Sequence, residues 1–178
     1  IVERAALDLE ELALLGDTSY TSGDSDDQDY MSLFDGWLKK GASGHVVNRA
    51  NATIAKEMFK DGLKAMPPQY LRNRGAMKHF VSVNQEAEFR DTMANRVGAL
   101  GDASVQGFQP LMAFGVPVEA AQLMPEAKGL FTNPLNLIFG IQRQVSLEFD
   151  KDISARVYVV VLTARVCVRS EEHTSELQ

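Results

Sequence analysis

The sequence predicts an α+β fold, in which helices and short strands come first and one long β-hairpin follows. Apolar residues recur at helical spacing through most of the segment 1–97. Short apolar segments that are interrupted by glycine and proline come next, and a long segment of strand character occupies residues 135–168. Helices and strands that are segregated along a chain are typical of α+β domains.

Helices are predicted wherever apolar residues repeat every three or four positions. They cover residues 1–15, 30–40, 53–66 and 85–97. At one boundary of each stands a residue that commonly begins or ends a helix. These boundary residues are Gly16, Gly41, Pro67 and Asn84. The N-terminal part of the chain is therefore expected to be mainly helical.

The acidic segment 17–29 lies between the first two predicted helices and is expected to be a loop. Its sequence DSDDQD resembles a calcium-binding loop only superficially. Asp29 stands where an EF-hand requires glycine, and Asp35 stands where it requires glutamate. Aspartates that cap a helix are the favoured interpretation, and no metal ligand is predicted. A second, glycine-rich loop is predicted over 98–110.

The remaining strands are short until the chain reaches residue 135. A strand is predicted at 80–83, and short strand pieces are predicted over 111–118 and 121–124. Gly115 and Pro117 interrupt the first of these pieces, since both residues disfavour a continuous central strand.

The segment 135–168 is predicted to form two strands joined at Asp150, Lys151 and Asp152. Both exceed the ordinary strand length of about five or six residues. In the first strand, apolar and polar positions alternate, which predicts one half-buried face. That face would carry Ile141, Arg143, Val145, Leu147 and Phe149. The second strand is apolar on both faces, which predicts burial on both sides.

A long hairpin with open edges invites pairing with other chains. We therefore expect the apolar residues of the first strand to be only partly covered within one subunit. These residues are Ile141, Val145, Leu147 and Phe149. The hairpin favours a protein whose work is association.

Composition is that of an ordinary soluble globular protein, with 45% hydrophobic and 24% charged residues. The formal net charge of −6 argues against a protein that wraps nucleic acid by neutralising phosphates. No apolar run approaches the roughly 20 residues of a membrane span, so no membrane partner is expected. The single cysteine, Cys167, excludes an internal disulfide and is expected to be a small core residue.

No catalytic, cofactor-binding or metal site emerges from the sequence. His45 and His79 lack metal-ligand spacing, and no nucleophile elbow, phosphate-binding loop or dinucleotide fingerprint is present. An enzymatic role is therefore not expected. An α+β enzyme whose site lies outside this sequence is kept as the alternative of a different class.

The order and spacing of several segments resemble the middle of a tailed-bacteriophage major capsid protein. These segments are GD at 16–17, SLFDGWLKK at 32–40, KAMPPQYLRN at 64–73, FVSVNQEAEFRDTMANRVGALGD at 80–102, FGVPV at 114–118 and LMPEAKGLFTNPLNLIFGIQRQVSLEFDKDISAR at 123–156. The last segment, RSEEHTSELQ at 169–178, resembles a translated sequencing adapter instead, and it is expected to be a non-native tail outside the fold. The chain is expected to be an internal fragment of a longer gene product.

The resemblance implies the Hong Kong 97 type capsid fold without its N-terminal arm and extended loop. Residues 1–28 would form the end of the spine helix and a connecting loop of the peripheral domain. Residues 29–124 would form the axial domain. Residues 125–168 would return to the peripheral domain with the long C-terminal β-hairpin.

The resemblance further implies a structural protein that self-assembles, as hexamers and pentamers, into the icosahedral head shell around double-stranded phage DNA. Scaffolding protein, portal and maturation protease would be its partners during assembly in the host bacterial cytoplasm, and the virion would be its destination. DNA would be enclosed without sequence-specific binding, and no cofactor is implied. An encapsulin-like compartment shell is the alternative of the same fold. The subunit-interface candidates are Asp150, Lys151, Asp152, Arg156, Phe108 and Phe114.

Overall fold

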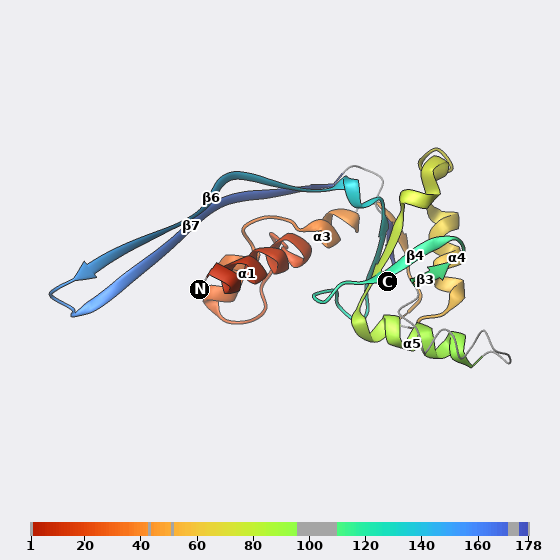
Figure 1. Ribbon diagram of the computed structural model, residues 1–178, viewed down its shortest axis with the longest axis horizontal. Helices are drawn as coiled ribbons and strands as arrows, with labels where there is room; N and C mark the ends of the chain where they lie inside the picture. Colours follow the sequence, from red (N-terminus) through yellow and green to blue (C-terminus); the bar gives the residue numbers. More distant parts are fainter. Residues whose placement is uncertain (1, 43, 51, 96–109, 171–174, 178) are drawn as a thin grey trace.

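The computed structural model describes residues 2–42, 44–50, 52–95, 110–170 and 175–177 (Figure 1). The helices are α1 (Val2–Leu15), α2 (Ser25–Met31), α3 (Trp37–Gly41), α4 (Lys56–Ala65) and α5 (Val83–Ala94), with short 3-10 helices at Tyr70–Ala76 and Pro134–Asn136. The strands are β1 (His45–Val47), β2 (Lys78–Val81), β3 (Leu111–Ala113), β4 (Val116–Ala120), β5 (Gly129–Thr132), β6 (Leu137–Asp152), β7 (Val157–Ser170) and β8 (Ser175–Leu177). None of the described helices is long and apolar enough to cross a membrane.

A six-stranded mixed sheet forms the body of the molecule, in the order β1-β8-β5-β2-β4-β3. Strand β5 lies inside this sheet, and all four of its residues are buried. On one face of the sheet, Phe131 packs with Phe59 of α4 and Phe89 of α5. On the other face, Leu130 packs with Leu38 of α3. Both faces of the central strand are therefore covered by helices of the same chain.

Strand β8 corrects the expectation that residues 169–178 lie outside the fold. Its backbone pairs in parallel with β1 and antiparallel with β5. The sequence did not reveal this strand because it is three residues long and has no alternating apolar pattern. Backbone hydrogen bonds, which do not depend on side-chain type, place it in the sheet. The adapter-like origin of this tail stays a prediction.

The predicted helix 30–40 is wrong, because the chain turns between α2 and α3. Gly36 lies against the C-terminal end of α1, where its N–H donates to the carbonyl oxygen of Gly16 at 2.7 Å. Helix α2 instead begins earlier, inside the predicted loop 17–29. Asp24 caps it by accepting a hydrogen bond from the backbone N–H of Asp27, as the aspartate-cap interpretation expected.

We expect Gly36→Ala to lower the free energy of unfolding by about 1–3 kcal/mol, because the added methyl group overpacks the junction. An ideal Cβ at Gly36 would lie 2.8 Å from the carbonyl oxygen of Leu14 and 2.9 Å from that of Ala13. Gly75→Ala is the matched control, since a Cβ there meets nothing within 4 Å. Thermal or denaturant unfolding of both variants checks this, and equal stability of the two would contradict it.

Several other boundaries differ from the sequence predictions. Helix α4 begins at Lys56, three residues later than predicted. Helix α5 is capped by Ser82 rather than Asn84, through a reciprocal capping box with Gln85. Strands β3 and β4 confirm the pieces around Gly115, but residues 121–124 form turns instead of a strand. The predicted loop 98–110 lies outside the described residues except for Pro110.

Candidate subunit interface

Strands β6 and β7 form a separate two-stranded antiparallel sheet that extends away from the six-stranded body (Figure 1). The turn between them lies at residues 153–156, where Arg156 has a φ of 54°. The predicted turn at 150–152 is wrong, since these residues still pair with 157–159. The Asp152 carboxylate sets the wider turn by accepting hydrogen bonds from the backbone N–H groups of Ser154 and Ala155.

The end of the hairpin has two chemically different faces, because residues directly opposite in an antiparallel pair point to the same side. The apolar face pairs Leu147 with Leu162, Phe149 with Val160 and Lys151 with Tyr158. The acidic face pairs Glu148 with Val161, Asp150 with Val159 and Asp152 with Val157. The Lys151 ammonium lies 5.6 Å from the centre of the Tyr158 ring, so even this polar residue packs against an aromatic neighbour.

The apolar side chains of this hairpin are exposed within one subunit. Phe149 is 70% exposed, Tyr158 74% and Ile153 79%. Eleven of the nineteen exposed large hydrophobic residues in the described part of the chain lie between residues 137 and 170. The expectation that Ile141, Val145, Leu147 and Phe149 are only partly covered is confirmed.

The predicted burial of the second strand on both sides is wrong. The valines at 157, 159, 160 and 161 are all exposed, because no described element of this chain stacks on either face there. The single alternating face predicted for β6 is also interrupted. Register irregularities between Ile141 and Arg143, and between Arg143 and Ser146, break the period of two.

The inner part of the hairpin is anchored to the helices. The indole N–H of Trp37 donates to the carbonyl oxygen of Arg169 at 3.2 Å, and the Lys40 ammonium donates to that of Val168. Cys167, which was expected in the core, is exposed; its Sγ points toward Gly140 on the paired strand. The next residue of the strand, Val168, is buried.

A cavity of about 470 Å³ remains between α1, the segment after α2 and strand β7. Its lining is mainly apolar and includes Leu9, Leu12, Phe34 and Val166. Tyr30 also lines it, and its buried hydroxyl has no hydrogen-bond partner among the described residues. Burial raises the pKa of this tyrosine to about 12, with further contributions from Asp8 and Glu11.

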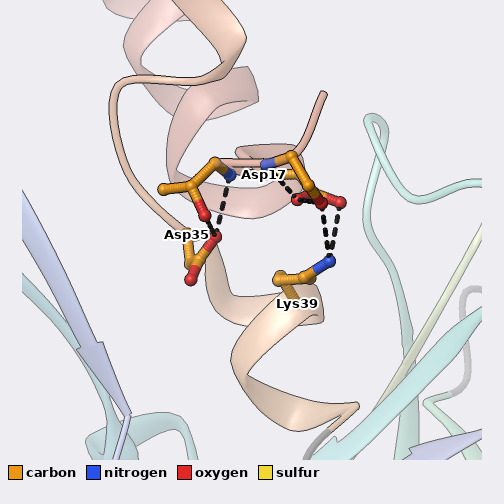
Figure 2. Close-up of polar contacts among 5 residues, drawn as sticks. Asp17, Asp35 and Lys39 are labelled. Carbon is orange, nitrogen blue, oxygen red and sulfur yellow. Dashed lines mark hydrogen bonds and ion pairs between the residues drawn. The ribbon is translucent and has the colours of Figure 1, made fainter. Parts of the chain in front are cut away.

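A polar network fixes the angle between α1 and α3 (Figure 2). Asp35 accepts hydrogen bonds from the backbone N–H and the hydroxyl of Thr18 at 2.9 and 2.8 Å. Asp17 accepts from the N–H and hydroxyl of Ser19 and forms an ion pair with Lys39 at 3.0 Å. The hydrogen bonds from Ser19, followed by that from Lys39, lower the pKa of Asp17 to about 2.

This network supports structure rather than nucleophilic chemistry. Lys39 also lies 3.2 Å from the Ser19 hydroxyl, but its ammonium is held by the Asp17 carboxylate and has no free lone pair to accept the serine proton. The network instead holds α3 at the end of α1. Since α3 carries Trp37 and Lys40, it also sets the direction in which the hairpin leaves the body.

The structure does not bring all six interface candidates together. Asp150, Lys151, Asp152 and Arg156 lie at the end of the hairpin, as expected. Phe114 lies on the opposite side of the molecule, in the turn between β3 and β4 (Figure 1). It is exposed and has a φ of 51°. Phe108 lies outside the described residues.

Sequence reasoning missed the exposed apolar residues of the tip, Ile153, Tyr158 and Val160. Their signal was present as an unusually apolar strand, which was interpreted as buried. The two histidines lie apart from the hairpin: His45 is exposed on β1, and His79 is buried in the core. Among the described residues, no group of three or more histidine, cysteine, aspartate or glutamate side chains is placed to hold a metal ion.

Comparisons with known proteins connect this geometry to shell proteins. The chain is 40% identical, over 178 residues, to YqbE of Bacillus subtilis (strain 168), whose name gives it the provisional description of a prophage capsid protein. This match covers 93% of the chain, which spans 55% of the length of that relative. No family model matches the sequence.

Solved structures decide the fold. The procapsid of satellite phage P4 matches with a TM-score of 0.66 and 12% identity, covering 99% of this chain and 60% of that one. The chain has the Hong Kong 97 type capsid fold. An encapsulin complex from Synechococcus elongatus PCC 7942 matches with a TM-score of 0.60 and 14% identity, covering 99% of this chain and 62% of that one. The Hong Kong 97 type resemblance and the α+β class are thus confirmed.

Proposed function

We propose that this chain belongs to the major capsid subunit of a tailed bacteriophage or prophage. Many copies of the subunit assemble into an icosahedral shell that encloses double-stranded DNA. The observation that carries the proposal is the exposed hairpin end, where Phe149, Tyr158 and Ile153 lie on a sheet of two strands. Such an apolar surface on an open-edged sheet is typical of a subunit whose neighbours complete it.

We propose that residues 1–28 form the end of the spine helix and its connecting loop, residues 29–124 the axial domain, and residues 125–168 the return to the peripheral domain. Within the last of these ranges, strand β5 pairs inside the six-stranded sheet of the body, and the hairpin leaves that sheet. The network of Asp17 and Lys39 lies where the spine helix meets the axial domain. It therefore holds the hairpin at a defined angle to the body, as a shell of repeated geometry requires.

Assembly involves the subunit itself, in hexamers and pentamers, together with a scaffolding protein, a portal and a maturation protease. It takes place in the host bacterial cytoplasm and ends in the virion. DNA is held by enclosure and not by sequence-specific contacts. The formal net charge of −6 supports this, since proteins that wrap DNA carry a positive surface. The role is structural and uses no catalytic residue or cofactor.

An encapsulin-like compartment shell, which encloses cargo proteins, is the second candidate because the fold is shared. The 40% identity to a prophage protein supports the phage role over this candidate. The proposal is tested by expressing the full-length gene product with the neighbouring genes of its locus and imaging negatively stained particles. Closed shells with nuclease-protected DNA are expected. Shells filled with a cargo protein would support the compartment, and a small oligomer without shells would contradict both.

A further inference from the structure

The exposed side of helix α5 carries carboxylates and amides. Positions 84, 88, 91 and 95 stand three or four residues apart, which places them in one line along the helix, and all four are exposed. Phe89 lies on the opposite side of the helix and is buried in the core. Val83 lies outside this line, since neighbouring residues of a helix point about 100° apart. The carboxylates of the line belong to Glu88 and Asp91.

Two asparagines of this line hold carboxylates in place. The Asn84 amide donates to the carboxylate of Glu126, and the Asn95 amide donates to that of Asp91 at 3.1 Å. We define Glu126, Glu88 and Asp91 as the acidic row of α5. None of the three forms an ion pair with a described residue. The amides orient two of these carboxylates without cancelling their charge, so less side-chain freedom is lost when a cationic partner binds.

Helix α4 displays the complementary charge. Lys56, Lys60 and Lys64 are all exposed and stand four residues apart, which places them in one lysine row along the helix. The opposite side of α4 is buried in the core through Phe59. Lys56 lies 3.9 Å from the neighbouring Glu57, at the outer limit of an ion pair. Lys60 and Lys64 form no ion pair with a described residue.

The two rows match in number, length and sign. Helix α4 rises by about 12 Å from Lys56 to Lys64. Helix α5 rises by about 10.5 Å from Asn84, which holds Glu126, to Asp91. Three lysines can therefore meet three carboxylates with a difference of about 1.5 Å over the whole row, which flexible lysine side chains absorb.

The rows do not face each other within one subunit. Phe59 of α4 and Phe89 of α5 meet in the core, with their ring centres 4.7 Å apart, so both helices turn their apolar sides inward. The two helices border different sides of the body (Figure 1). The charged rows therefore point outward from two sides of the same subunit, where each is open to another molecule.

We propose that the acidic row of α5 docks on the lysine row of α4 in a second copy of the same chain. The contact joins two different patches, so each copy is rotated relative to the one before it, and a ring forms when this rotation closes. The proposed hexamers and pentamers are rings of this kind. The inference rests on the proposed shell function and names the surfaces by which neighbouring copies meet within one ring.

The test is a charge exchange in the full-length gene product. Glu88→Lys with Asp91→Lys, and separately Lys60→Glu with Lys64→Glu, are each expected to raise the protein concentration needed for shell formation by roughly tenfold or more, because like charges then face each other. The variant that carries all four substitutions is expected to regain assembly. Light scattering and sedimentation measure the shells, and unfolding curves confirm that each variant is folded.

Asp26→Lys with Asp29→Lys is the matched control, since it makes the same change of charge at two exposed carboxylates on α2. It is expected to assemble like the wild type. Normal assembly of both charge-reversed variants, or failure of the fourfold variant while the control assembles, would overturn the docking contact and leave the shell function standing. Lysine variants that assemble normally but lose packaged DNA would also overturn it and assign the lysine row to DNA. A wild type without shells would overturn the shell function and this contact together.

Discussion

A Phe149→Ser, Tyr158→Ser variant is expected to lose shell assembly almost completely while the single subunit keeps its fold. Both side chains lie on the apolar face of the hairpin end and are about three-quarters exposed, at 70% and 74%. An aromatic hot-spot residue that is buried in a subunit contact contributes about 2 kcal/mol or more to the free energy of association. Because every subunit of a shell repeats the contact, a loss of about this size at each one is enough to prevent closure.

These substitutions are expected to leave the free energy of unfolding of the single subunit almost unchanged. The outer hairpin stacks on no described element of its own subunit, and exposed positions of this kind change unfolding free energies by about 0.5 kcal/mol or less. The matched control is Val83→Ser with Leu135→Ser, which removes two exposed apolar side chains elsewhere. Analytical ultracentrifugation with circular dichroism checks both variants. Normal shells from the hairpin variant would refute the role of its apolar face.

Acidification is expected to destabilise the body of the subunit through His79. This ring is fully buried and lies between Phe59, at 4.8 Å, and Phe131, at 4.3 Å between ring centres. Neither ring nitrogen has a hydrogen-bond partner among the described residues. Burial therefore lowers the pKa of His79 to about 3, far below its ordinary value of 6.5.

The unfolded chain binds the histidine proton below about pH 6.5, whereas the folded chain resists it down to about pH 3. Stability from this group is complete above pH 6.5 and is lost progressively as the pH falls toward 3. Between pH 7.5 and pH 5 the expected loss is about 2 kcal/mol. Denaturant unfolding of His79→Phe at both pH values should show a dependence that is smaller by this amount.

Exposed His45 provides the control for this measurement, because His45→Gln removes a histidine without changing a buried group. It should retain the full pH dependence of the wild type. An unchanged dependence in His79→Phe, with a normal dependence in His45→Gln, would show that His79 does not sense pH. If His79→Phe is too unstable to study, His79→Leu tests the same point with a smaller side chain.

Local patterns predicted much of this fold. Helix α1, helix α4 and the strands around Gly115 follow from spacing, caps and breakers that act over a few residues. The break between α2 and α3 does not, because it depends on Gly36 meeting the end of α1, a contact between separate segments. The placement of β8 likewise depends on backbone pairing with β1 and β5. The sequence of its three residues does not indicate this pairing.

The hairpin that carries the candidate interface was predicted, but the exposure of its apolar residues was not. The long hairpin pointed to association, and the carboxylates near its end were correctly expected there. The apolar strand β7 was interpreted as buried, because a sequence does not distinguish residues covered by their own chain from residues covered by another. In this chain Tyr158 and Val160 are exposed, where the apolar pattern of the strand had predicted burial. The turn at 153–156 was missed because the Asp152 side chain, and not a turn dipeptide, sets it.

The most direct test of the central claim is a cryo-electron microscopy map of the shell formed by the full-length gene product. In that map the end of the hairpin, including Phe149 and Tyr158, is expected to lie against a neighbouring copy and to be largely covered. A shell in which this hairpin projects freely into solvent would contradict the claim that its exposed apolar surface exists for assembly.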